Sequence, residues 1–513
     1  MRKTLSLLLA TLMLLGSMAF TAASAEEAPL VITMVAPFFA EQPPAGTVGE
    51  EGNPVLEAVE KLCNVDLQIT YAPQGDFVQK YNTVMASTEQ PMVMVITSGL
   101  TKNSKYLEDC QFGVFWDLTD FITQRPLFKD ELTTPYCMTV TAVGGRNYLF
   151  PIQVSSARVA MLYRQDWLDK LGIPVPTTAK EFYEMAKAFT EKDPDGNGQK
   201  DTYGFAYIDD ADKELTYAGF DTLAVALGAP NRWGQNAEGK IMPYFTFPEY
   251  MDTLNLFKDM YDNGYMNSDF ALIKGNDKHL PLGEGKAGAM FTTATNGRYP
   301  GGKYDQLFST ITPTAQIGRN YLLTAPNGSQ VINSTLSVGG VGGFLIPKAA
   351  VKDEATVQRI LDFFEKLQSA EEDGGCKLLT VGVEDLHYTQ DKSTGVITIT
   401  PEQAQLRVTD GSNEVFISLA PRRVVAPDFG QGRTQLDLIN LEAVANEPYA
   451  VPDLSVGKLN PDQMSLEASI ALTISDARVQ YIMGQIDAAG FEKAVQEWME
   501  QGGNDLIEAV NAK

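Results

Sequence analysis

The chain has 513 residues, of which 65 are Asp or Glu and 40 are Lys or Arg, so its formal net charge is −25. This acidic balance argues against nucleic acids and anionic lipids as partners, while the 44% hydrophobic content is ordinary for a globular protein of this length. Only two histidines, His279 and His387, are present, which excludes a His-rich metal centre.

The first 25 residues have the pattern of a secretory signal peptide. Arg2 and Lys3 precede an apolar run, and Ala23-Ser24-Ala25 forms a small-residue cleavage site. We therefore expect export to a periplasm or to the cell exterior, with the mature chain starting at Glu26. No Cys lies near the cleavage site, so we expect no lipid anchor.

Strand and helix patterns alternate after this leader. Segments 30–38, 65–72 and 91–99 read as strands, and segments 55–63 and 76–87 as amphipathic helices. Short connections between such elements predict an α/β sandwich with mostly parallel sheets. Helical stripes recur further along, and the last ~60 residues read as mainly helical on periodicity.

The segment 177–204 joins an amphipathic helix to an acidic loop. Thr178 and Glu181 form a capping box at the start of the helix. The loop DPDGNGQKD then places oxygen-bearing groups at alternating positions, as calcium-binding EF-hand loops do. We therefore predict a structural calcium site with side chains of Asp193, Asp195, Asn197 and Asp201 and the carbonyl of Gln199.

The same loop departs from an EF-hand in two respects. Position 12 is Gly204, so the bidentate closing carboxylate is missing, and a strand pattern follows where an EF-hand has a helix. A solvated turn without an ion is therefore the open alternative.

Motifs for nucleotide binding and covalent catalysis are weak or missing. Gly283–Gly288 matches GxGxxG, but it stands between a turn and a strand, and a dinucleotide fingerprint needs a strand before it and a helix after it. Neither a Walker A motif nor a GxSxG elbow occurs. The pairing, if any, of Cys63, Cys110, Cys137 and Cys376 is open.

Several segments, taken in order, resemble one family. They are 148–189, 193–204, 247–271, 285–291, 342–350, 382–389 and 481–503. Their order resembles the extracellular solute-binding proteins of ABC importers, in the family-1 sugar-binding group, and more narrowly the long oligosaccharide binders. In similar proteins with alginate-type ligands, a loop like DPDGNGQKD holds calcium, and Thr202 stands where a further acidic ligand can occur.

The resemblance implies two α/β lobes joined by a hinge, with a helical C-terminal extension. We expect residues 26–154 and 312–343 in the N-terminal lobe, and residues 155–311 and 344–513 in the C-terminal lobe. Crossings are expected near 154–159, 311–313 and 343–346. The carboxyl ends of parallel strands should face the space between the lobes.

Candidate ligand-binding residues follow from loop position and from the resemblance. Trp233 stands in a polar, Gly-rich stretch where the family often has a ligand-facing aromatic side chain. Others follow predicted strands, and local packing is the alternative role for each. The predicted set is Trp233, Asn296, Arg298, Tyr299, Phe38, Phe39 and Ser98.

The resemblance implies a monomeric binding protein that captures an oligosaccharide and delivers it to membrane permease subunits, without catalysis. A secreted glycosidase is one alternative, but it needs two carboxylates at a defined separation, and no motif selects such a pair. A binding protein for a peptide or another non-sugar solute is the other alternative, because a fold does not fix its ligand.

Overall fold

The computed structural model describes most of the chain from residue 28 to residue 512. The described residues are 28–38, 43–44, 52–97, 100–101, 103–125, 138–152, 154–209, 219–273, 280–297, 308, 311–334, 342–412, 415, 419–420, 428–432 and 435–512. The predicted signal peptide therefore lies outside them. No helix within these ranges is long and apolar enough to cross a membrane.

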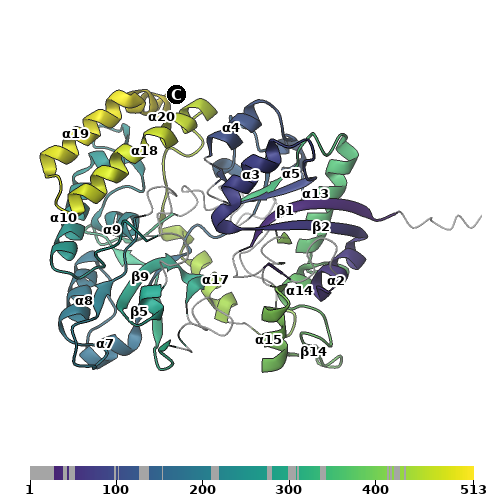
Figure 1. Ribbon diagram of the computed structural model, residues 1–513, viewed down its shortest axis with the longest axis horizontal. Helices are drawn as coiled ribbons and strands as arrows, with labels where there is room; N and C mark the ends of the chain where they lie inside the picture. Colours follow the sequence, from purple (N-terminus) through teal and green to yellow (C-terminus); the bar gives the residue numbers. More distant parts are fainter. Residues whose placement is uncertain are drawn as a thin grey trace, which may run out of the picture.

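The chain forms two α/β lobes that lie side by side (Figure 1). The first lobe is built on a sheet in which the strands run in the order β2-β1-β3-β13-β4. β1 is parallel to β2 and β3, whereas β13 is antiparallel to both β3 and β4. The strands are β1 (Leu30–Phe38), β2 (Val65–Pro73), β3 (Val93–Ile96), β13 (Gly343–Leu345) and β4 (Leu149–Pro151).

Local sequence explains the first elements of this lobe. Asn53 caps α2 (Pro54–Cys63) by accepting hydrogen bonds from the backbone N–H groups of Val55 and Leu56 at 3.1 Å. The helix ends where Asn64 adopts a left-handed conformation with φ of 52°. The VMVI sequence of β3 is an apolar run without alternation, which suits a strand that is buried at every position.

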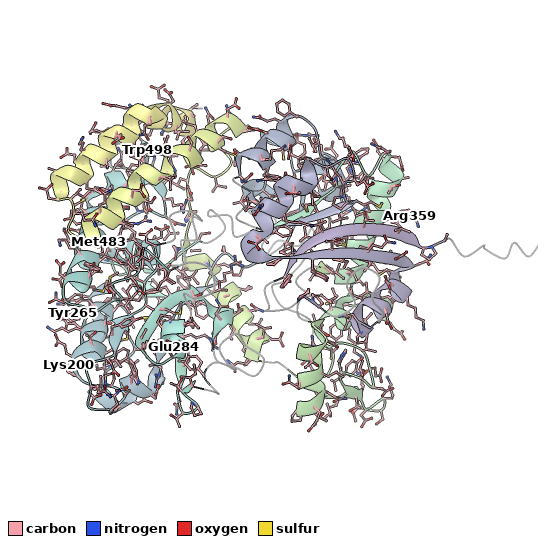
Figure 2. All side chains as sticks on the ribbon, viewed as in Figure 1. Lys200, Tyr265, Glu284, Arg359, Met483 and Trp498 are labelled. Atoms are coloured by element: carbon pink, nitrogen blue, oxygen red, sulfur yellow. The ribbon has the colours of Figure 1, made fainter. Side chains whose placement is uncertain are left out.

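The first lobe is completed by residues that come late in the chain. β13 lies in the sheet between β3 and β4, and α13 (Glu354–Gln368) packs into the same core. The rings of Phe344 and Phe364 stack with centroids 4.0 Å apart. Figure 2 shows Arg359 of α13 on the first lobe. This differs from the expected boundary, which placed 344–513 in the second lobe.

The second lobe has a smaller mixed sheet with the strand order β10-β5-β9-β6. Only β6 and β9 are parallel, while β5 is antiparallel to β9 and β10. β10 thus places 317–320 in the second lobe, and not in the first as expected. The strands are β10 (Ile317–Asn320), β5 (Val159–Arg164), β9 (Ala287–Thr293) and β6 (Tyr203–Phe205).

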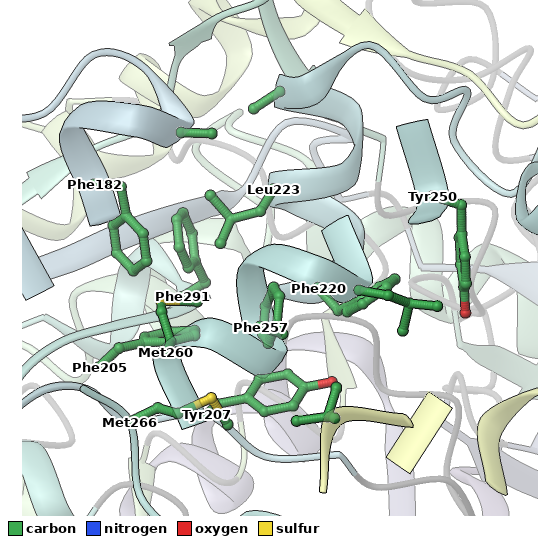
Figure 3. Close-up of a cluster of buried hydrophobic side chains, with 14 of the residues drawn as sticks. Phe182, Phe205, Tyr207, Phe220, Leu223, Tyr250, Phe257, Met260, Met266 and Phe291 are labelled. Atoms are coloured by element: carbon green, nitrogen blue, oxygen red, sulfur yellow. The ribbon is translucent and has the colours of Figure 1, made fainter. Parts of the chain in front are cut away.

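An aromatic core fills the second lobe between this sheet and its helices (Figure 3). Phe205 of β6 packs edge-on against Phe182 of α8 (Ala179–Glu191), with ring centroids 5.0 Å apart. Phe257 of α10 (Pro248–Asp262) meets Tyr207 at 4.7 Å. Edge-to-face pairs of this kind suit the charge distribution of aromatic rings.

The C-terminal helices cover this lobe, as the resemblance implied. α18 (Pro461–Ile482), α19 (Ala488–Trp498) and α20 (Asn504–Asn511) contribute apolar side chains to the second-lobe core. The predicted two-lobe α/β fold with a helical extension is confirmed. The sheets differ from the mostly parallel ones expected, because the first-lobe sheet is mixed and the second-lobe sheet is mostly antiparallel.

The remaining elements connect or flank these layers. They are α3 (Phe77–Met85), α4 (Ser104–Gln111), α5 (Thr119–Ile122), α7 (Gln165–Leu171), α9 (Phe220–Leu227), β7 (Trp233–Gln235), β8 (Ile241–Pro243), α11 (Leu280–Gly283), β11 (Leu323–Thr324), β12 (Gln330–Asn333), α14 (Cys376–Thr380), β14 (Thr389–Gln390), β15 (Ile397–Thr398), α15 (Pro401–Thr409), α17 (Gln435–Ala445) and β16 (Ala450–Val451).

Candidate functional site

In each lobe, one edge of the sheet lies where the chain crosses between the lobes. Strand β4 leads into the first crossing, and its pairing through β13 gives it the same direction as β1, β2 and β3. The carboxyl ends of all four strands therefore lie at the crossing. In the second lobe, Thr293 at the end of β9 pairs with Val159 at the start of β5, where the chain arrives. Ligands of open α/β sheets bind at such edges.

The first-lobe edge carries Phe38 and two polar side chains. Phe38 ends β1 and is half-buried. Gln74 follows β2 and donates a hydrogen bond from Nε2 to Thr97 Oγ1 at 3.1 Å, just beyond β3. Among the described residues, Gln74 Oε1 is buried without a partner. Phe39 and Ser98, predicted for the same edge, lie outside the described residues.

The second-lobe edge carries Asn296. It belongs to the short helix η7 (Ala294–Asn296), directly after β9, and its Nδ2 donates to Thr292 Oγ1 at 3.0 Å. Asn296 is half-buried, and its role in ligand binding stays a prediction that rests on the family resemblance. Arg298 and Tyr299 lie outside the described residues.

A glutamate near the C-terminal end of the chain reaches the first crossing. Val154 packs in the first-lobe core and Ala157 in the second, so Ser155 and Ser156 lie between them. The N–H of Ser156 donates to Glu447 Oε1 at 3.1 Å. Burial raises the pKa of Glu447, and hydrogen bonds from Ser155 and Ser156 oppose that rise. Through this hydrogen bond, Glu447 connects the crossing at Ser156 to the second lobe.

Tyr449 belongs to the same turn, η9 (Glu447–Tyr449), and 42% of it is exposed. Sequence reasoning missed both residues. The available signal was an aromatic side chain between Pro448 and Pro452, in a stretch that cannot form a continuous helix.

Trp233 is not on an exposed loop. It lies in β7, which pairs with β8, and only 4% of it is exposed. Its indole Nε1 donates to Glu467 Oε1 at 3.0 Å, and its ring lies 6.3 Å from that of Trp498, centroid to centroid. The C-terminal extension covers it, so its faces are occupied by protein. The expectation of a ligand-facing Trp233 is wrong for this conformation.

The acidic loop is closed by hydrogen bonds of its own. Asp193 accepts from the N–H groups of Gly196 and Gly198 at 3.0 and 3.1 Å. Asn197 Nδ2 donates to Asp195 at 2.8 Å and to Asp201 at 3.1 Å. Figure 2 shows Lys200 on the outer flank of the second lobe, away from the first.

The charges in this loop affect one another. Burial raises the pKa of Asp195. The hydrogen bond between the carboxyl groups of Asp193 and Asp195 holds the pKa of Asp193 below its ordinary value. The N–H of Gln199 donates to Asn197 Oδ1 at 2.7 Å. Among the described residues no cluster of three or more His, Cys, Asp or Glu side chains has the arrangement of a metal site. Asn197 Nδ2 lies between Asp195 and Asp201, so a cation bound there would replace its hydrogen bonds, and the hard oxygen donors of the loop suit calcium.

His387 has a structural setting. It is fully buried in the first lobe, with Nε2 2.7 Å from Asp410 Oδ2. Its Nδ1 accepts the N–H of Val383 at 3.0 Å, so the ring proton of the neutral form lies on Nε2. A buried, satisfied pair of this kind faces no substrate.

Comparisons with known proteins are consistent across sequence and structure. Residues 47–373 match the family described as bacterial extracellular solute-binding protein. The chain is 30% identical to Lipoprotein LipO of Bacillus subtilis (strain 168), over 99% of this chain and 97% of that protein. It is also 30% identical to the polygalacturonan/rhamnogalacturonan-binding protein YtcQ of the same organism, over 88% and 86% of the two chains.

A solved structure extends the comparison to the fold. The chain superposes on the Streptococcus pneumoniae ABC-transporter substrate-binding protein FusA, solved as an EF-hand mutant in complex with fructo-nystose. The TM-score is 0.64 at 16% identity, over 94% of this chain and 98% of that chain. At this identity the likeness establishes a common fold.

Proposed function

The chain belongs to the family of bacterial extracellular solute-binding proteins, and on this premise we propose that it captures an oligosaccharide between its two lobes and delivers it to the membrane subunits of an ABC importer. The observation that carries the proposal is that the end of β4 in the first lobe, and the end of β9 beside the start of β5 in the second, both lie at the first crossing. The names of two relatives support a carbohydrate ligand: YtcQ is named as a polygalacturonan/rhamnogalacturonan-binding protein, and FusA as a fructooligosaccharide ABC transporter substrate-binding protein.

The proposed binding surface contains both aromatic and polar side chains. Tyr449 and Phe38 offer apolar ring faces for the C–H faces of sugar rings, while Gln74, Thr97 and Asn296 offer hydrogen-bonding groups to hydroxyls. Phe39, Ser98, Arg298 and Tyr299 remain predicted members from their positions in the sequence.

We propose binding without hydrolysis. A glycosidase needs two carboxyl groups flanking one bond. At the described sheet edges Glu447 accepts a hydrogen bond from Ser156, and the polar side chains at the strand ends are Gln74, Thr97 and Asn296. Incubation with a labelled oligosaccharide, followed by mass spectrometry, tests this. Recovery of intact sugar is expected, and shortened products would favour the glycosidase.

A thermal-shift screen tests the ligand class. A ligand that binds only the folded protein raises the melting temperature, so oligogalacturonides and fructo-oligosaccharides are compared with peptides of similar mass. Stabilisation by a sugar series is expected. Stabilisation by peptides alone would replace the carbohydrate by another solute.

We also propose that the acidic loop takes up calcium. Asp193, Asp195, Asn197, the carbonyl of Gln199 and Asp201 supply hard oxygen donors, and FusA, which shares the fold, was solved as an EF-hand mutant. When bound, the ion would join the end of α8 to the start of β6 and would act on stability.

Export and processing form the last part of the proposal. We propose cleavage before Glu26, following the Ala23-Ser24-Ala25 pattern. LipO is named as a lipoprotein, so the processed form needs measurement. The intact mass of the exported protein distinguishes a chain starting at Glu26 from a lipid-modified one.

A further inference from the structure

Helix α18 belongs to the second lobe along most of its length. Ile470, Ile474 and Tyr481 pack into the second-lobe core. Arg478 donates two hydrogen bonds to the buried carboxylate of Asp209, at 2.6 and 2.7 Å. These contacts fix the helix to one lobe, so it must move with that lobe as a rigid body.

The first turn of the same helix contacts the other lobe. Met464 packs against a first-lobe cluster that includes Leu107 of α4 and Val143. Gln111, at the end of α4, donates from Nε2 to Asp462 Oδ1 at 3.1 Å. In Figure 1, α18 extends from beside α4 across the second lobe toward α10.

One glycine brings the lobes close beside this contact. A Cβ atom at Gly144 would make only an ordinary van der Waals contact with Pro461, the first residue of α18, at 3.8 Å, so the space there would admit a side chain. A Cβ at Gly457 would lie 2.8 Å from the Thr139 side chain, which is closer than Cβ atoms approach, and its φ is +76°. The approach of the second-lobe segment before α18 to the first lobe therefore depends on glycine.

We propose that the first turn of α18 is a non-covalent pivot, which keeps its contact with α4 while the two lobes open and close. The proposal rests on lobe closure around a ligand. A second fixed point, the crossing at Ser155–Ser156, lies at the sheet edges. If the contact at α18 and the crossing at the sheet edges both persist, the lobes can rotate about the line that joins them, and this line is the proposed hinge axis.

The chemistry of the contact suits a rotating joint. Met464 supplies an unbranched, flexible side chain that can follow small changes in its surroundings. The polar link between Gln111 and Asp462 is exposed, so water can replace it without leaving a buried polar group unpaired.

A ligand-free experiment tests the pivot directly. Fluorescent labels, one on each lobe, report the interlobe distance distribution by single-molecule energy transfer. Met464→Ala is expected to broaden that distribution, whereas Leu472→Ala, on the same helix and 45% exposed, is the matched control. Identical distributions for both variants and the wild type would overturn the proposal. Because no sugar is present, failure here is distinct from failure of the proposed function.

A cross-link then separates a pivot from a latch. Gln111→Cys with Asp462→Cys replaces the hydrogen-bonded pair, and peptide mapping confirms the bridge against the neighbouring Cys110. With a sugar identified by the thermal-shift screen, the oxidised protein is expected to keep its affinity within about threefold of the reduced protein, which is under 1 kcal/mol. A loss of more than tenfold on oxidation, restored by reduction, would show that the contact must open for binding, and would overturn the pivot.

Discussion

The N–H of Ser156 donates to Glu447 Oε1 at 3.1 Å, and this bond joins residues 291 positions apart in the sequence. It holds the first interlobe crossing against a turn that follows α17. The carboxyl group is half-buried, and burial raises its pKa. A substitution at position 447 that changes this hydrogen bond or removes the titrating carboxyl group should therefore change the stability of the protein.

Glu447→Gln is expected to make stability depend less on pH. A carboxyl group whose pKa is raised by folding stabilises the fold below its unfolded pKa, and this contribution is lost as the pH rises through the folded pKa. At pH 7 the charged Glu447 is therefore less favourable than a neutral acceptor. The melting temperature of Glu447→Gln should exceed that of the wild type at pH 7, and the difference should shrink as the pH is lowered toward 4. A difference that stays constant with pH would contradict this account.

Tyr449→Ala is expected to weaken sugar binding more than it weakens the fold. An aromatic anchor in a small interface contributes about 2 kcal/mol, or roughly 30-fold in affinity, by analogy with interface hot spots. Tyr449→Phe keeps the ring face and should bind within a few-fold of the wild type. Phe112→Ala, an exposed aromatic at the end of α4, is the control outside the proposed surface. Equal affinities for Tyr449→Ala and the wild type in titration calorimetry would remove Tyr449 from that surface.

Trp233→Ala is expected to unfold the protein more easily. Truncating a buried aromatic side chain costs roughly 3–5 kcal/mol, and this change also removes the donor to Glu467. Trp233→Phe keeps most of the buried ring and loses the hydrogen bond, so it should cost less. Denaturant titration of both variants checks the order. A stable Trp233→Ala with impaired sugar binding would show that the covered ring becomes accessible in another conformation.

Asp195→Asn with Asp201→Asn is expected to abolish stabilisation by calcium. The substitutions keep size and remove two of the three carboxylates around Asn197. Calcium should raise the melting temperature of the wild type alone, and a chelator should reverse that rise. Sugar affinity should stay within a few-fold, because Figure 2 shows Lys200 of this loop on the outer flank of the second lobe. If calcium leaves the wild-type melting curve unchanged, the loop is a turn closed by its own hydrogen bonds.

Helices and strands could be predicted from short-range sequence patterns, whereas the burial of Trp233, the contact of Glu447 and the lobe boundaries depend on contacts between distant segments. The capping of α8 by Thr178 depends on residues three positions apart, so the sequence alone indicated it. The burial of Trp233 depends on Glu467 and Trp498, more than 200 residues later, and a polar stretch around it gave no sign of that cover. Glu447 was missed for the same reason, because its partner Ser156 lies in a distant segment. The lobe boundaries failed at 312–343 and beyond 344, because strand order in a sheet cannot be read from the periodicity of each strand.

The position of β13 has a consequence for biogenesis. β13 occupies an interior place in the first-lobe sheet, between β3 and β4, yet it is synthesised only after the whole sheet of the second lobe. A nascent chain that has reached residue 152 therefore lacks the strand that joins β4 to the rest, and it also lacks α13. Domains generally fold as units during synthesis, but here the N-terminal part has no complete unit to form. The first-lobe core also includes Val415, Leu419 and Ala420, so all of its residues are present only after most of the chain has been synthesised.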